Sequence, residues 1–168
     1  MVLISFIWFS VVLAGWGISF ALAIIPGSIY TNGYINAAAN IFSYFFINPM
    51  ANRIGRKVSL IITLFMGGVG FLLYQPLSTL GEIPTYVCMT VGVFGSVCAL
   101  NFVYLVTTES FPTVYRGTAF GFGSLWARVG GIVAPLLVQI AQNSLMYIFG
   151  GMCMVSGVFS FFLKETKD

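Results

Sequence analysis

Six long apolar runs, separated by short polar or proline-containing breaks, constrain the fold of this 168-residue chain more than any other feature. Each run is long enough for a helix that crosses a hydrocarbon core of about 30 Å at about 1.5 Å per residue. Because lipid offers no partner for backbone N–H and C=O groups, such runs must form helices that satisfy these groups internally. The sequence therefore predicts an all-α, multi-pass integral membrane protein with a single domain over residues 1–168. The six expected transmembrane helices lie near residues 2–26, 30–51, 58–75, 84–108, 117–141 and 144–163.

Composition argues against a soluble domain beside these helices. Hydrophobic residues make up 59% of the chain and charged residues only 7%, whereas soluble domains carry about 25% charged residues. The net charge of +3 comes from small basic clusters between apolar runs, so the chain has no basic face for nucleic acid. The expected partner is the lipid bilayer, and nucleic acid is not expected.

The scarcity of reactive side chains argues against an enzyme. The chain has no histidine, and its four acids are too few and too scattered for a paired-carboxylate site. The three cysteines lie in apolar runs without C-x-x-C spacing, so we expect reduced core cysteines rather than disulfides or a zinc site. No catalytic residue, metal site or cofactor is expected. The residues concerned are Glu82, Glu109, Glu165, Asp168, Cys88, Cys98 and Cys153.

Six of the seven basic residues follow the second, fourth and sixth apolar runs, and therefore share one side of the membrane if every run crosses it. The loops after the first, third and fifth runs contain no lysine or arginine, only Glu82. Basic loops mark the cytoplasmic side. We therefore expect both termini to be cytoplasmic, and we favour the plasma membrane over internal membranes. The six basic residues are Arg53, Arg56, Lys57, Arg116, Lys164 and Lys167.

The seventh basic residue, Arg128, lies inside the fifth apolar run. If Gly117 opens that run, Arg128 is roughly 17 Å further along a helix, near the middle of the hydrocarbon core. A charge at this depth costs roughly 2.5 to 3.5 kcal/mol and normally faces a bundle interior or a watery cavity. Because none of the acids lies at its depth, we interpret Arg128 as a binding residue; an unseen structural partner is the alternative.

Polar and small residues recur every three or four positions in four of the six runs. The stripe is strongest in the fifth run, weaker in the first, second and fourth, and almost absent from the third and sixth. We infer that four helices line a wet space and that two act as scaffold. The stripe residues include Gly117, Gly121, Ser124, Arg128, Gly131, Pro135 and Gln139 in the fifth run, Asn101 and Tyr104 in the fourth, Asn36, Asn40 and Tyr44 in the second, and Trp16 in the first.

These residues also have structural explanations. Small residues at this spacing, such as Gly117 and Gly121, are what tight helix packing in lipid requires, and we expect packing to explain most of the glycines. For the asparagines and Tyr104, a hydrogen bond between helices competes with a ligand contact. Trp8 fits the aromatic belt at the membrane interface.

Glu109 and the basic residues around it suggest a cytoplasmic latch. Glu109 ends the fourth helix, where the helix dipole opposes an anion, so it needs a basic partner such as Arg116, Arg53 or Arg56. Such a pair would hold the inner ends of the helices in one conformation, although an exposed pair is worth under about 1 kcal/mol. The alternative is that these charges only fix the topology.

Two motifs resemble those of a known family. Asn52-Arg53-Ile54-Gly55-Arg56-Lys57 is similar to the D-R-x-G-R-R/K loop of the major facilitator superfamily, with Asn52 in place of the usual aspartate. The segment from Thr108 to Arg116, followed by Arg128-Val129-Gly130 and Pro135, resembles the E-x-x-P-T-x-x-R and R-x-G-x-x-x-x-P signature of its organic ion transporter family. Trp8-Phe9 and the closing Leu163-Lys164-Glu165-Thr166 match that family more weakly. The resemblance implies the C-terminal six-helix half, helices seven to twelve, of a twelve-helix transporter.

The resemblance also implies roles for individual residues. Arg128 would hold an anionic or zwitterionic group, and Trp16, Asn101 and Tyr104 would line the substrate cavity. Tyr44 stands where some anion carriers of the family have a lysine, so exchange of dicarboxylate-type anions is not supported. The latch would consist of Arg53, Gly55, Arg56, Lys57, Glu109 and Arg116.

The sequence therefore predicts transport of a small organic ion, preferably an anion or a zwitterion, by alternating access. Because six helices form only one wall of such a cavity, an N-terminal six-helix half or a second copy is needed to close it. Two alternatives are an organic cation or neutral solute such as a sugar, and an inactive truncated membrane module.

Overall fold

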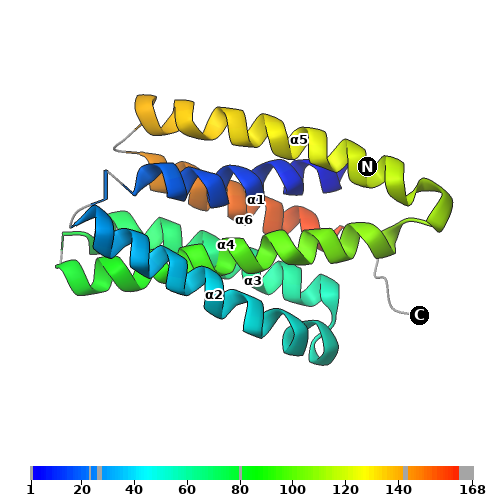
Figure 1. Ribbon diagram of the computed structural model, residues 1–168, viewed down its shortest axis with the longest axis horizontal. Coiled ribbons are helices and arrows are strands. Elements are labelled where there is room, and N and C mark those ends of the chain that lie inside the picture. Colours follow the sequence, from blue (N-terminus) through cyan, green and yellow to red (C-terminus); the bar gives the residue numbers. More distant parts are fainter. Residues whose placement is uncertain (1, 23, 26–27, 80, 142–143, 163–168) are drawn as a thin grey trace.

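The computed structural model of the chain is a bundle of six α-helices (Figure 1). It describes residues 2–22, 24–25, 28–79, 81–141 and 144–162, and the closing 163–166 motif and the basic residues Lys164 and Lys167 lie outside these ranges. The described residues contain only helices and short connections, which confirms the predicted all-α fold. The helices are α1 (Val2–Ala21), α2 (Ile29–Arg53), α3 (Arg56–Leu77), α4 (Glu82–Ser110), α5 (Thr113–Ile140) and α6 (Leu145–Phe161).

Length and apolarity identify a multi-pass integral membrane protein. Among the described helices, α1, α3, α4 and α5 are each long and apolar enough to cross a membrane. The described part of α6 is strongly apolar but, with 17 residues, is shorter than the about 20 residues that usually cross a membrane. α2 has 25 residues, which is ample length, but its apolar character is diluted by Asn32, Asn36, Asn40 and Asn48.

Proline chemistry sets the break between α4 and α5. Phe111 is extended, with φ −120° and ψ 138°, as the residue before a proline prefers. Pro112 precedes the first residue of α5, and its carbonyl accepts hydrogen bonds from the backbone N–H groups of Tyr115 and Arg116, both at 3.0 Å. α5 therefore begins at Thr113, earlier than the expected residue 117, and Arg116 belongs to its first turn.

The end of α1 is set by a contact that helical periodicity does not reveal. The backbone N–H groups of Ile24 and Ile25 donate to Ala21 O at 2.9 and 3.2 Å. The buried side chain of Asn32, in the first turn of α2, donates to Leu22 O at 3.2 Å and to Ile25 O at 3.1 Å. These bonds satisfy carbonyls that a continuing helix would otherwise use. α1 therefore ends at Ala21 rather than near residue 26.

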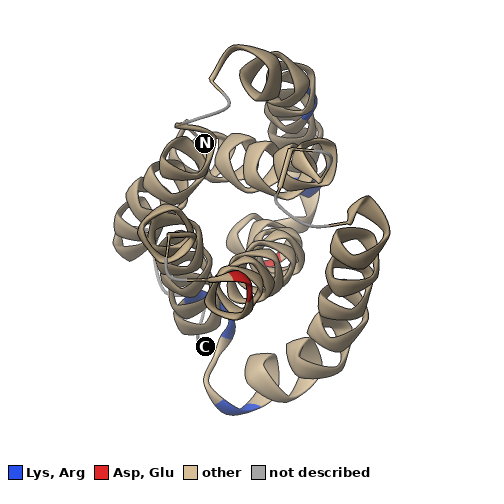
Figure 2. Cartoon of the chain, turned by 90° about the vertical axis from the view of Figure 1, so that its left-hand side faces the viewer, with Lys and Arg blue, Asp and Glu red and all other residues tan. Residues whose placement is uncertain are grey.

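The helices form two layers. α5, α1, α4 and α2 follow one another in the first layer, each packed against the next. α6 and α3 form the second layer, in which α6 lies on α1 and α3 lies on α4. Figure 2 shows the bundle nearly end-on and how few of its segments carry charge. One side of α1 and α4 is thus covered by the second layer, and no described helix of the chain covers the other side.

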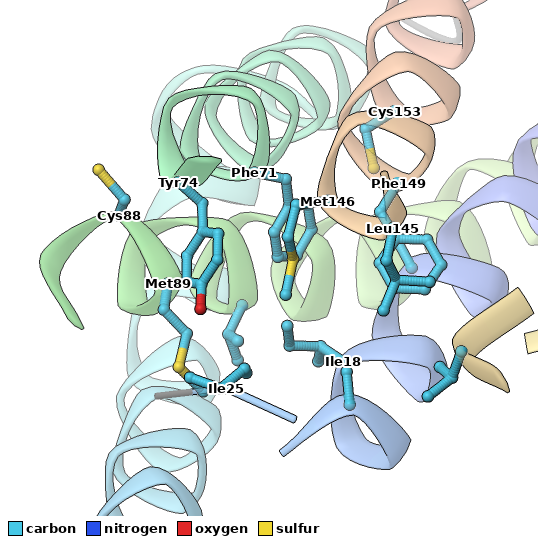
Figure 3. Close-up of a cluster of buried hydrophobic side chains, with 14 of the residues drawn as sticks. Ile18, Ile25, Phe71, Tyr74, Cys88, Met89, Leu145, Met146, Phe149 and Cys153 are labelled. Atoms are coloured by element: carbon cyan, nitrogen blue, oxygen red, sulfur yellow. The ribbon is translucent and has the colours of Figure 1, made fainter. Parts of the chain in front are cut away.

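The buried side chains gather in two clusters along the bundle. The cluster of Figure 3 includes Phe71 and Phe149, whose ring centroids are 6.3 Å apart, and also contains Met89 and Met146. Tyr74 and Ile18 belong to the same cluster, which contains residues from all six helices. The second cluster lies nearer the start of α1 and contains Trp8, Leu60, Leu64 and Phe102. Cys88, Cys98 and Cys153 are free and buried, as expected for core cysteines.

The closest helix contact joins α3 to α4 through glycines. A Cβ atom added at Gly95 would overlap the backbone of Gly67, and one added at Gly70 would lie 2.8 Å from the Cα of Gly92. Lipid tails are as apolar as leucine, so helices in a membrane associate through close packing rather than through burial from water. These four glycines allow the backbones of α3 and α4 to touch.

We predict that Gly95→Ala destabilises the chain, whereas Gly151→Ala does not. The added methyl group at position 95 overlaps the backbone of α3, and overpacking of this kind typically costs about 1 to 3 kcal/mol. At Gly151 the same methyl group meets nothing within 4 Å, and alanine is favoured over glycine in a helix by roughly 0.5 to 1 kcal/mol. The free energies of unfolding in detergent measure the difference. Equal stability of the two variants would contradict the proposed role of the glycine contact.

Candidate functional site

Arg128 lies near the middle of α5 and is exposed. It follows Ala127 of the helix face that packs on α1, about 100° further round the helix, so its side chain leaves that interface. In the part of the chain that the structure describes, no ion pair involves Arg128. A cation at this depth needs a counter-charge, water or polar groups, and no ion pair among the described residues supplies the counter-charge. The packed face consists of Ala119, Gly123, Ala127, Gly130, Ala134 and Val138.

Gly117 and Gly121 lie about three and two turns before Arg128 in α5 and do not pack against another helix in the described residues. A Cβ atom at Gly117 or Gly121 would meet nothing within 4 Å, so the close packing expected at these two glycines does not occur among the described residues. The packing glycines are Gly123, where a Cβ atom would lie 2.8 Å from the indole nitrogen of Trp8, and Gly130, where it would lie 2.7 Å from Phe9 O. Small residues occur on two faces of α5, and the sequence does not tell which face meets α1.

Tyr104 joins three helices through its ring. Its centroid lies 4.4 Å from that of Trp8 in α1 and 5.4 Å from that of Phe120 in α5. The indole N–H of Trp8 donates to Thr107 Oγ1 at 3.0 Å. Trp8 is only 1% exposed, so its expected place in an interfacial belt is wrong; it is a buried indole with a hydrogen-bond partner. Tyr104 is 39% exposed, and the buried ring of Trp8 holds it in place from one side.

The other predicted binding residues are exposed or half-buried. Trp16 of α1 and Tyr44 of α2 are 56% and 59% exposed. Asn101 of α4 is half-buried, and its side-chain nitrogen donates to Val97 O, one turn earlier, at 2.9 Å. Asn40 makes the same kind of bond within α2. The interhelical hydrogen bonds considered for these two asparagines therefore do not form in the described residues.

The five predicted binding residues come from the four helices of the first layer. None of them forms a hydrogen bond or ring contact with another of the five in the described ranges. The large hydrophobic side chains exposed on α3 and α6 belong to the second layer, as expected for helices that face lipid. The five binding residues are Arg128, Trp16, Asn101, Tyr104 and Tyr44, and the exposed second-layer residues are Val58, Ile62, Val69, Leu73, Tyr147, Val155, Val158 and Phe161.

The turn between α2 and α3 lies at the same end of the bundle as the end of α4 (Figure 1). Gly55 has φ 94°, a conformation that other residues rarely adopt, and it lets α3 begin directly at Arg56. Arg56 forms an ion pair with Glu109 in the last turn of α4. The two side chains are 46% and 25% exposed, so solvent screens the pair and it is worth under about 1 kcal/mol. The Oε2 atom of Glu109 is buried and has no hydrogen-bond partner among the described residues.

The other basic residues at this end have different surroundings. The Nζ atom of Lys57 donates to the carbonyl of Phe161, the last residue of α6, at 3.1 Å. A cation is favourable there because it faces the negative end of the helix dipole. Arg53 and Arg116 are exposed, and neither takes part in an ion pair within the described ranges. Of the three partners considered for Glu109, the structure selects Arg56.

Sequence comparison finds relatives over nearly the whole chain. Solute carrier family 22 member 6-B of Xenopus laevis is 36% identical over 173 residues, which cover 97% of this chain and 30% of the relative. Solute carrier family 22 member 21 of Mus musculus is 30% identical and covers 96% of this chain and 29% of the relative. Organic cation/carnitine transporter 2 of Rattus norvegicus is 29% identical and covers 95% of this chain and 29% of the relative. No protein family model matches the chain.

The chain spans about 30% of the length of the curated relatives it matches. These relatives are named as solute carriers or transporters, which agrees with the prediction that the chain is not an enzyme. The resemblance inferred from the motifs around Glu109 and Arg128 is thereby confirmed. The chain is a homologue of the organic ion transporters of solute carrier family 22, within the major facilitator superfamily, and corresponds to a part of them.

Proposed function

We propose that this chain forms the C-terminal six-helix half, helices seven to twelve, of an organic ion transporter that works by alternating access. Transporters of this class bind substrate near the middle of the bilayer between two six-helix halves. The six helices and the short match to the relatives support a single half, whose uncovered side would face the other half. The second wall would come from an N-terminal six-helix half or from a second copy of the chain.

The observation that carries this proposal is the position of Arg128. Its guanidinium is exposed near the middle of α5 and has no ion-pair partner among the described residues. A buried cation is stable in a membrane when it faces water or an opposite charge. A carboxylate or similar anionic group of a substrate would supply that charge, so we favour a small organic anion or zwitterion as the solute.

Besides Arg128, the proposed binding site would contain aromatic rings and a side-chain amide. Trp16 and Tyr104 offer ring faces to an organic solute, and the amide of Asn101 offers a polar group on the same helix as Tyr104. Tyr44 of α2 would contribute from the far end of the layer. Such a mixture of many apolar contacts with a few polar groups is typical of binding sites for small organic molecules.

An organic cation is the alternative solute. Relatives named for cations include the organic cation transporter-like protein of Drosophila melanogaster and organic cation/carnitine transporter 2 of Rattus norvegicus. With a cationic solute, Arg128 would serve the structure instead of the ligand. A panel of anionic, zwitterionic, cationic and neutral solutes separates these possibilities by mutual competition for uptake.

We predict that Arg128→Ala, in the chain expressed with an N-terminal half, lowers uptake of the anionic solute by about tenfold or more. A hydrogen bond to a charged group is worth roughly 1.5 to 3 kcal/mol, and each 1.4 kcal/mol is a factor of ten. Uptake is measured against the amount of protein at the cell surface. Arg128→Lys keeps the charge and is expected to retain part of the uptake. Unchanged uptake by Arg128→Ala at equal surface amount would exclude Arg128 as the counter-charge.

We further propose that the basic cluster of the α2–α3 turn and Glu109 act as a latch on the cytoplasmic side. The ion pair between Arg56 and Glu109 supports this proposal, because it ties the start of α3 to the end of α4. Gly55 shapes the turn that positions Arg56, and Lys57 fixes the neighbouring end of α6. Arg53 and Arg116 would act in a conformation in which the second half of the transporter approaches this end.

We predict that Arg56→Gln and Glu109→Gln each reduce the maximal rate of uptake to a similar degree, and that the double variant is no worse than either single one. Residues that act as a pair show this non-additivity in a double-mutant cycle. Glu82→Gln is the matched control, because Glu82 is an exposed acid at the start of α4, at the opposite end of the helix. Additive losses, or an equal loss in the Glu82 variant, would argue against a latch made by this pair.

A further inference from the structure

A groove lies between the first half of α5 and the first half of α1. Its volume is about 310 Å³, and it is lined by Val2, Ser5, Phe6, Phe9, Phe122 and Trp126. Four of these six side chains are aromatic and none is charged. The volume lies at the lower end of the range of about 300 to 1,000 Å³ that is usual for small-molecule sites. Its chemistry suits hydrocarbon and excludes a polar solute.

The groove and Arg128 lie on different sides of α5. Trp126 and Arg128 are two positions apart in α5, which is about 200° round the helix, so they point in nearly opposite directions. Phe6 also packs edge-on against Phe159 of α6, with a centroid distance of 5.2 Å. The groove therefore opens toward α6 of the second layer and not toward Arg128.

A cationic side chain lies beyond one end of the groove. Val2, which lines the groove, begins α1 and is 79% exposed, so the groove reaches the end of that helix. At this end α5 extends past the start of α1 (Figure 1). Arg116 lies in the extending part, six positions before Phe122, which places it about 9 Å along α5 and about 120° round the helix from that residue. Arg116 is exposed and forms no ion pair in the described ranges, because Glu109 pairs with Arg56.

We propose that this groove binds an acyl chain of an anionic phospholipid whose head group contacts Arg116. The aromatic lining would hold the chain, and the guanidinium would hold the phosphate at the membrane surface, where arginine forms paired hydrogen bonds to phosphate oxygens. The basic end of the bundle faces the leaflet that is rich in anionic lipids if it is cytoplasmic. This inference concerns a groove on another side of α5 than Arg128, and Arg116 would have this role in addition to the one proposed for it in the latch.

The chain contains three tryptophans, and Trp126 lies in the groove, so bromine-labelled lipids report its occupancy. The chain is reconstituted into phosphatidylcholine vesicles that contain increasing small fractions of phosphatidylserine with brominated acyl chains. The fluorescence lost from Trp126 is obtained as the difference between the chain and its Trp126→Phe variant. We expect quenching to saturate at a severalfold lower lipid fraction with brominated phosphatidylserine than with brominated phosphatidylcholine. Identical curves for the two lipids would overturn the proposal.

Two pairs of variants test the two parts of the site. Arg116→Gln should move the phosphatidylserine curve onto the phosphatidylcholine curve, whereas Arg53→Gln, an exposed arginine at the same end of the bundle in α2, should leave it in place. Phe122→Ala should weaken quenching at low lipid fraction, whereas Phe45→Ala, an exposed phenylalanine in α2, should not. An unchanged curve for Arg116→Gln overturns the proposal.

The same measurement also detects two other possible occupants of the groove, a sterol and a protein segment. Stronger quenching by a brominated sterol than by phosphatidylserine overturns the proposal, because a sterol lacks the anionic head group that Arg116 would bind. Absence of quenching by either phospholipid also overturns it, because the groove would then be covered by protein. Both outcomes are read against the Trp126→Phe variant, whose remaining quenching comes from the other two tryptophans.

Discussion

Close approach of helix backbones is the constraint on which this structure depends. In lipid, helices gain nothing by burying apolar surface from one another, so contact relies on packing at short distance. Glycines supply that distance where α3 meets α4, at Gly67 and Gly95, and where α5 meets α1, at Gly123 and Gly130. These contacts, with α6 between α1 and α3, cover one side of the bundle and leave the other side of α1 and α4 open. Because of this asymmetry, Arg128, Trp16, Tyr44 and Tyr104 of the first layer stay exposed in the described part of the chain.

The fold could be predicted from the sequence because membrane helices leave a strong and simple signal. Six apolar runs, the basic clusters and the break at Pro112 were sufficient for the number and order of the helices. The ends of the helices were less accessible, because they depend on hydrogen bonds between distant groups. Asn32 illustrates this: its side chain holds two carbonyls of the preceding turn and is completely buried, yet it reads in the sequence as one of several polar residues of the second helix.

Residues of the candidate site could be predicted from the sequence where the free-energy cost of a charge in the membrane identifies them. They could not be predicted where contacts with residues distant in the sequence determine their surroundings. A lone arginine in an apolar run is expensive wherever it points, so Arg128 could be singled out by depth alone. Three arginines were possible partners for Glu109, and only the geometry of the turn at Gly55 selects Arg56. Trp8 was misplaced because position along a helix suggests an interface, whereas its partner Thr107 lies far along the chain. The roles of these residues in binding stay predictions.

The weakness of the pair between Arg56 and Glu109 fits the latch better than a strong bond would. A carrier must populate two conformations, so their free energies can differ by only a few kcal/mol. About 5.5 kcal/mol already moves a two-state equilibrium from 1:99 to 99:1. A contact with ten times the free energy of an exposed ion pair would therefore hold the protein in one conformation. Partly exposed charges give a smaller bias that a solute can reverse through its own binding energy. In the proposed mechanism the same reasoning separates Arg128 from these residues, since a cation in the middle of the membrane would gain most from an anionic ligand, and that gain would favour the change of conformation.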